Sequence, residues 1–111
     1  MESIEIELYV SEEGKCPFQE WIEQLDKVEA VRVEERLSRV RDGNFGDAKR
    51  ISEGIWELRL FHGSGYRIYY HVPGPGKIVI LDAGDKKTQR RDLRTAQMFL
   101  EDYLVRTREA N

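Results

Sequence analysis

The chain of 111 residues contains a single cysteine, Cys16, so no intramolecular disulfide can hold the fold together. We interpret Cys16 as an ordinary residue of a protein in the reducing cytoplasm. No apolar run approaches the ~20 residues that span a bilayer, and no secretory signal pattern opens the sequence. We therefore expect a cytoplasmic protein with no membrane partner.

The sequence also has no pattern typical of a metal or cofactor site. His62 and His71 are isolated, with no cysteine or carboxylate at ligand spacing. The segment 63–65 (Gly-Ser-Gly) is too short to cradle a phosphate, and nothing around Ser64 resembles a nucleophile elbow. We expect no metal and no cofactor, an exposed His62 in a turn, and His71 as a candidate proton carrier near neutral pH.

The composition is that of one globular domain over residues 1–111, with 40% hydrophobic and 35% charged residues. The net charge of −3 argues against a general nucleic-acid binder. The charge is unevenly distributed, however: residues 1–48 have 13 acids and 6 bases, or −7, and residues 49–111 have 8 acids and 12 bases, or +4. This asymmetry favours a local anionic partner for the second half of the chain.

The stretch from Gly54 to Val72 predicts a β-hairpin, because two alternating segments flank a glycine-containing turn. With the turn centred on Gly63, one face carries large apolar or amphipathic side chains and is expected to be core. The facing pairs on it are Leu60 with Tyr66, Leu58 with Ile68, and Trp56 with Tyr70.

The other face of the hairpin places Arg59 across from Arg67 and Glu57 across from Tyr69. Two like charges that face each other in a sheet repel. The two arginines are therefore either screened by solvent or used to bind an anion. Neither is expected in the core, so Arg67→Ala should change the free energy of unfolding by about 1 kcal/mol or less.

Around the hairpin, apolar periodicity gives the element order β-α-α-β-β-β-α. Most of the charges of the second helix, a series that includes Arg36, are expected on a solvated face. The first expected element is a strand over 4–10 that buries Ile4, Ile6, Leu8 and Val10. Helices over about 17–25 and 27–42, a loop over 44–53 and an interior strand over 77–83 are also expected. The last helix is expected to be capped by Thr88 and to bury Leu93, Ala96, Leu100, Tyr103 and Leu104.

Five bases crowd the start of the last helix: Lys86, Lys87, Arg90, Arg91 and Arg94. Positively charged side chains at the start of a helix oppose its dipole. The arrangement becomes favourable if an anion binds among them; without an anion, they form a solvated first turn. Arginine forks match phosphate geometry, and aromatic side chains stack on unpaired bases. Cations and tyrosines on an open sheet face, followed by this basic helix start, are therefore compatible with single-stranded RNA, which has its own nucleophile in the 2′-OH.

Five segments in order resemble the phage-derived addiction-module killer proteins of the RelE/ParE/HigB superfamily of type II toxins. The resemblance covers about residues 4–104. The segments are Pro17-Phe18 with Trp21 and Leu25, Gly43 to Asp47, Ile55 to Arg59, Gly65 to Tyr70, and Gly84 to Gln89.

The resemblance implies an α+β fold with helices packed on a small, mostly antiparallel sheet. It implies a cognate antitoxin of the helix-turn-helix kind encoded next door, contact with operator DNA only through that antitoxin, and metal-independent cleavage of messenger RNA on the ribosome. Two alternatives stay open. One is a ParE-like inhibitor of DNA gyrase without nuclease activity, and the other is an inactive relative that only binds an antitoxin.

By position, the resemblance implies catalytic roles for Arg59, Arg67 and Lys86. RelE itself has a positively charged residue at the position of Glu57 in this chain, and a tyrosine at the position of Leu93. Glu57 is therefore our candidate general base, with His71 and Tyr69 as alternatives, or else the site works mainly by electrostatics. The residues we expect to contact RNA are Lys49, Tyr69, His71, Lys87 and Arg90.

Overall fold

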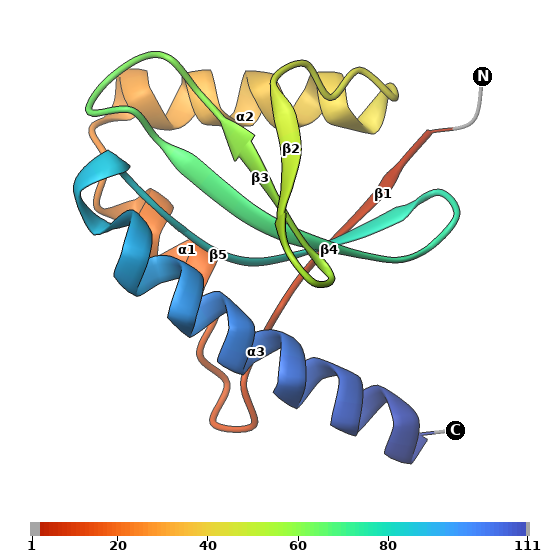
Figure 1. The fold of residues 1–111 in the computed structure, drawn as a ribbon. Helices are drawn as coiled ribbons and strands as arrows, with labels where there is room; N and C mark the ends of the chain where they lie inside the picture. Colours follow the sequence, from red (N-terminus) through yellow and green to blue (C-terminus); the bar gives the residue numbers. More distant parts are fainter. Residues whose placement is uncertain (1–2, 111) are drawn as a thin grey trace.

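Helices cover both faces of a five-stranded sheet in the computed structural model, which describes residues 3–110 (Figure 1). The elements are β1 (Glu5–Leu8), α1 (Pro17–Glu23), α2 (Lys27–Arg41), β2 (Ala48–Ser52), β3 (Ile55–Arg59), β4 (Arg67–Gly74), β5 (Lys77–Gly84), the short 3-10 helix η1 (Lys86–Thr88) and α3 (Gln89–Ala110). The strand order is β1-β5-β4-β3-β2, and only the β1–β5 pair is parallel. This architecture confirms the expected α+β class.

The predicted hairpin register is confirmed in β3 and β4. Trp56 pairs with Tyr70, Leu58 with Ile68, and Arg59 with Arg67. The Leu60 amide donates to the Tyr66 carbonyl just beyond the ladder. Every side chain of this apolar face is buried except Trp56, which lies towards the sheet edge and is 36% exposed.

Two hydrophobic cores lie on opposite faces of the sheet. The first lies between the sheet and the α1–α2 pair, and it includes Phe18, Val33, Leu37, Val40, Leu58 and Ile68. The second lies between the sheet and α3, and it includes Ile55, Tyr69, Val79, Leu81, Ala96 and Leu100. The expectation of an open sheet face behind the arginines is therefore wrong, because α3 packs across that face (Figure 1).

Two local expectations in the first half of the chain are also wrong. Residues 48–52, expected as loop, form the edge strand β2, whose adjacent charges Lys49 and Arg50 hide its strand pattern. In the first strand, regular pairing ends at Leu8. The buried side chain there is Tyr9, whose hydroxyl donates to Asp102 at 2.6 Å, and Val10 is exposed.

The junction between β5 and α3 differs in detail from the expectation. The residue that caps the start of η1 is Asp85 rather than Thr88. The Asp85 carboxylate accepts hydrogen bonds from the amides of Lys87 and Thr88, and the Thr88 hydroxyl accepts one from the Asp85 amide. Gly84 has no side chain that would collide with Asp92 of α3, so the helix can approach the sheet closely. Further along α3, Leu104 is 40% exposed rather than buried. No helix among residues 3–110 is long and apolar enough to cross a membrane.

Two carboxylates are buried along the seam between β5 and the start of α3. Asp82 is 8% exposed and Asp92 is 5% exposed. Burial raises the pKa of Asp82 to about 7; Asp92 adds to the rise, whereas the Ala83 amide and Arg91 oppose it. The folded chain therefore keeps the Asp82 proton between about pH 4 and 7, where the unfolded chain loses it. Asp82 consequently lowers the free energy of unfolding as the pH rises through this range.

We expect Asp82→Asn to remove this loss. The variant should be more stable than wild type at pH 8, by roughly 1–4 kcal/mol, and close to it near pH 4. Thermal melting across this pH range measures the difference. Asp102→Asn is a control of opposite sign, because hydrogen bonds from Tyr9 and Arg106 lower the pKa of Asp102. An Asp82→Asn effect that is the same at every pH would contradict this account.

Candidate functional site

The two paired arginines differ in exposure although they project from the same sheet face. The Arg59 side chain is 33% exposed, and its guanidinium contacts the Asp47 carboxylate through Nε at 3.1 Å and a terminal nitrogen at 3.3 Å. The Arg67 side chain is only 11% exposed, and one terminal nitrogen donates to the Gly65 carbonyl at 3.1 Å. Arg59 thus borders solvent, whereas Arg67 is nearly enclosed.

Arg67 lies against a carboxylate that solvent does not reach. Glu57 is fully buried; its Oε2 accepts from the Gln89 side chain of α3 at 2.7 Å and lies 3.8 Å from Nε of Arg67. Oε1 of Glu57 and Nε of Arg67 have no hydrogen-bond partner among the described residues. The expectation that Arg67 lies outside the core is therefore wrong, because Arg67→Ala would leave the Glu57 charge buried without its cation, which typically costs about 3–5 kcal/mol.

A buried arginine on α2 fixes the backbone behind this pair. Arg36 donates to the Arg59 carbonyl at 2.7 Å, to the Phe45 carbonyl at 2.9 Å and to the Asp47 carbonyl at 3.3 Å. Burial is the main cause that lowers its pKa. The expectation that Arg36 lies on a solvated face is wrong: it joins α2 to β3, which carries Arg59, and to the segment before β2 that contains Phe45 and Asp47. In the sequence, its place between Val33 and Leu37, towards the buried stripe, is the only signal of this role.

Lys86 is brought beside Arg67 by contacts between the hairpin loop and η1. The Lys86 amide donates to the Ser64 carbonyl at 3.4 Å, and the Ser64 hydroxyl donates to Asp85 at 3.2 Å. A Cβ at Gly65 would lie 3.5 Å from the Lys86 Cβ and 3.6 Å from a terminal nitrogen of Arg67, so these two residues flank the glycine. Arg59, Arg67 and Lys86, selected from sequence, therefore lie together at one end of the sheet.

The residues that we expected to contact RNA divide into two groups. Lys49, Lys87 and Arg90 are exposed. Tyr69 is fully buried in the second core, its hydroxyl has no partner among the described residues, and burial raises its pKa. It has no surface on which a base could stack.

The two histidines are both half-buried and hydrogen-bonded. His71 lies four residues along β4 from Arg67, about 13 Å at strand spacing, and its ring hydrogen-bonds the Gly54 carbonyl at 2.7 Å. It therefore lies outside the arginine cluster. His62 is not the exposed turn residue that we expected, since its ring bonds the Glu29 carboxylate at 2.8 Å.

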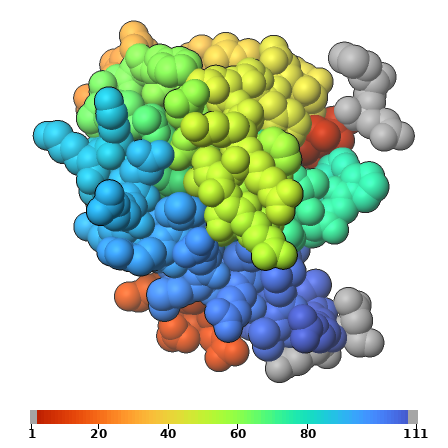
Figure 2. All heavy atoms as spheres, in the orientation of Figure 1, coloured from red at the N-terminus to blue at the C-terminus, as the bar shows by residue number. Residues whose placement is uncertain are grey.

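The exposed bases follow the start of α3 and the neighbouring edge strand. Lys49 pairs with Glu57 in the β2–β3 ladder and therefore lies on the α3 side of the sheet. Gln97 bonds Ser52 of β2, and Arg90 and Arg94 share that side of α3 by helical spacing. Figure 2 shows the yellow-green β2 segment directly beside the blue first half of α3. We name Lys49, Arg59, Lys86, Lys87, Arg90 and Arg94 the basic rim.

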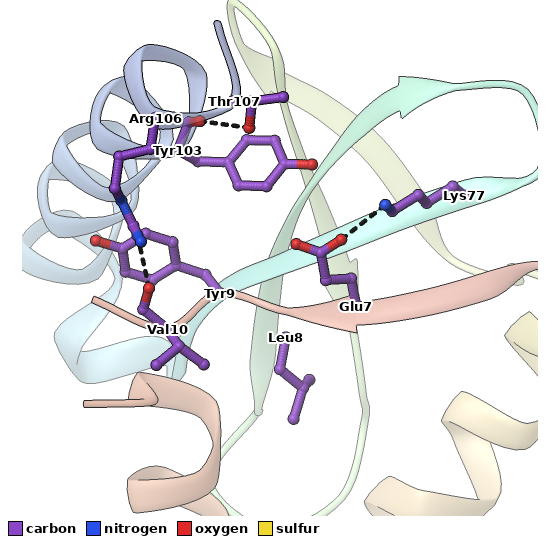
Figure 3. Close-up of a pocket in the computed structure, with 8 residues that line it drawn as sticks. All are labelled: Glu7, Leu8, Tyr9, Val10, Lys77, Tyr103, Arg106 and Thr107. Carbon is purple, nitrogen blue, oxygen red and sulfur yellow. Dashed lines mark hydrogen bonds and ion pairs between the residues drawn. The ribbon is translucent and has the colours of Figure 1, made fainter. Parts of the chain in front are cut away.

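A hollow at the opposite end of α3 serves a structural role. Figure 3 shows its charged residues engaged with one another or with the backbone: Lys77 contacts Glu7 at 2.7 Å, and Arg106 donates to the Val10 carbonyl at 2.6 Å. None of the expected site residues lines it. The Lys77 contact joins β5 to β1, and the Arg106 contact fastens the end of α3 to the segment after β1. Within residues 3–110, no group of three histidine, cysteine or carboxylate side chains could hold a metal ion.

Comparison with known proteins identifies the family. Residues 20–101 match the family "Phage derived protein Gp49-like (DUF891)", so the chain belongs to the Gp49-like proteins, a RelE-like toxin family. An uncharacterized protein of Haemophilus influenzae (strain ATCC 51907 / DSM 11121 / KW20 / Rd) is 35% identical over 86 residues, which cover 77% of this chain and 87% of that protein.

Proposed function

We propose that this protein is the toxin of a type II toxin–antitoxin system and cleaves messenger RNA on the ribosome, in the cytoplasm, without a metal. The observation that carries the proposal is the cluster of Arg59, Arg67 and Lys86 at one end of the sheet. Three cations from three segments converge there beside the basic rim. Such a cluster suits a phosphate that gains charge during a reaction.

The proposed reaction uses the nucleophile of the RNA itself. The 2′-OH loses its proton and attacks the adjacent phosphorus, the bond to the 5′-oxygen breaks, and that oxygen takes up a proton. The products are a 2′,3′-cyclic phosphate and a 5′-OH. Arg59 and Arg67 hold the phosphate and stabilise its added charge, and Lys86 adds charge or protonates the leaving oxygen.

The burial of Glu57 changes the role that we propose for it. A general base must come within hydrogen-bond reach of the proton that it removes. Glu57 has no exposed surface and contacts Gln89 and Arg67, so we assign it to positioning Arg67. Because Tyr69 is buried and His71 lies outside the cluster, we infer that cleavage depends mainly on orientation and charge stabilisation.

The sharpest test replaces the cations that are not buried. Arg59→Gln should lower the rate of message cleavage on ribosomes by roughly 10²–10³, the usual effect of losing one donor to a developing oxyanion. Lys86→Gln should also lower it. Because Lys86 is exposed and Arg59 forms only a partly exposed ion pair with Asp47, thermal melting should stay close to wild type. Transcript cleavage and growth arrest after induction measure the effect.

Arg108→Gln and Lys15→Gln are matched controls, since both remove an exposed charge away from the cluster. Wild-type cleavage by a folded Arg59→Gln protein that still binds ribosomes would remove Arg59 from the site. Wild-type killing without any cut transcript, accompanied by a DNA damage response, would favour the gyrase-inhibitor alternative.

We further propose that a cognate antitoxin places an acidic segment over the basic rim. Exposed cations attract acidic peptides, and residues 49–111 carry a net charge of +4. In the co-purified complex, amine labelling of Lys86 and Lys87 should fall severalfold, while labelling of Lys15 stays unchanged. Arg67 is a poor reporter because it is already buried. Equal labelling of Lys86 and Lys87 with and without a verified antitoxin would contradict this mode of neutralisation.

A further inference from the structure

An exposed aromatic side chain lies just beyond the end of β3, next to residues of α2. Phe61 directly follows Leu60 in the loop between β3 and β4, and 80% of its surface is exposed. It is two residues from Arg59, about 7 Å at strand spacing. Phe61 also has the largest exposed fraction among the large hydrophobic side chains for which the structure gives burial.

The exposure of Phe61 does not come from a loose loop. The Gly65 amide donates to the His62 carbonyl, and the His62 ring bonds Glu29 at the start of α2. The Tyr66 ring packs edge-on against Trp21 at 5.4 Å and against His62 at the same distance. The loop is thus fastened to both helices of the first core, so Phe61 is presented to solvent at little further cost in conformational entropy.

A cationic pocket of about 380 Å³ adjoins Phe61. Its lining comes from α2 and the hairpin loop: Arg32, Glu35, Arg36, Arg39, Leu60, Phe61 and His62. Arg36 is occupied by the backbone carbonyls that it binds. Arg32 and Arg39 are exposed, and neither forms an ion pair with a carboxylate among the described residues. Glu35 is the one carboxylate in the lining.

We propose that Phe61, Arg32 and Arg39 form a subsite for one unpaired nucleotide of an RNA strand that reaches the Arg59–Arg67 pair. An exposed aromatic ring next to arginines is the combination that holds single strands: the base stacks on the ring, and the arginines bind the phosphate. This inference rests on the proposed RNA substrate. In it, Phe61, Arg32 and Arg39 fix which nucleotide of the RNA lies at the Arg59–Arg67 pair.

The pocket lies on the α2 side of the sheet, and Arg36 connects it to the strand that carries Arg59. Arg36 lies in the pocket wall and donates to the Arg59 carbonyl, so the subsite and the phosphate-binding arginine share one anchored piece of backbone. A base held on Phe61 would therefore be fixed relative to the scissile phosphate. The subsite selects which nucleotide step is presented, and Phe61 is a positioning residue.

Binding of a short single-stranded RNA with 2′-O-methyl groups tests the subsite separately from cleavage, because such an RNA cannot be cut by 2′-OH attack. Phe61→Leu should weaken binding roughly 10-fold, and Phe61→Tyr should stay within about twofold of wild type, because it keeps the stacking ring. A 2-aminopurine in the RNA should lose fluorescence on binding to wild type and to Phe61→Tyr but not to Phe61→Leu. Met98→Leu, at an exposed apolar position on α3, is the control.

The slope of log Kd against log salt should fall by about one in Arg32→Gln and in Arg39→Gln. The control Arg41→Gln, at the end of α2 and outside the pocket lining, should change this slope less.

Unchanged affinity and fluorescence in Phe61→Leu would overturn the proposal, as would a wild-type chain that does not bind the RNA. Loss of antitoxin binding by Phe61→Leu with RNA binding intact would instead make the patch a protein contact and equally overturn it. Phe61-dependent binding by a protein that leaves messenger RNA uncut on ribosomes would keep the subsite and remove the nuclease function.

Discussion

The arrangement of the site depends on the burial of Glu57 and Arg67 together beneath α3. A carboxylate without access to water needs a nearby cation and hydrogen-bond donors. Glu57 receives one hydrogen bond from Gln89, the first residue of α3, and has Arg67 at 3.8 Å. The start of α3 is therefore fixed over β3 and β4. Because η1 immediately precedes Gln89, the same constraint places Lys86 beside the hairpin loop.

This constraint divides the cations into two kinds. Arg67 is held in a nearly dry environment, where its charge is screened little; in the proposed function it needs no reorganisation when a phosphate binds. Arg59, Lys86 and the rest of the basic rim face solvent and can attract and contact a substrate or an acidic peptide. Arg36 does neither: its three bonds to carbonyls hold the backbone that carries Arg59 and Asp47, and the Phe61 pocket is built against it.

The sequence was sufficient for features that depend on local alternation and turn chemistry. The β3–β4 register, both helices before it and the interior strand β5 follow from such patterns, and the register alone places Arg59 opposite Arg67. Features that depend on packing between distant segments were not predictable. Nothing local shows that α3 covers the arginine face, that Arg36 reaches three carbonyls, or that Glu57 and Tyr69 are buried. The edge strand β2 was missed because two adjacent charges conceal its alternation.

The chemistry of the cleaved ends tests the central claim most directly. The account predicts that the wild-type chain, added to ribosomes that carry a defined message, yields an upstream fragment with a 2′,3′-cyclic phosphate and a downstream fragment with a 5′-OH. It also predicts that a single 2′-deoxy substitution at the cut position abolishes cleavage there. Fragments with a 3′-OH and a 5′-phosphate, or undiminished cleavage at the 2′-deoxy position, would contradict 2′-OH attack and the roles assigned to Arg59, Arg67 and Lys86.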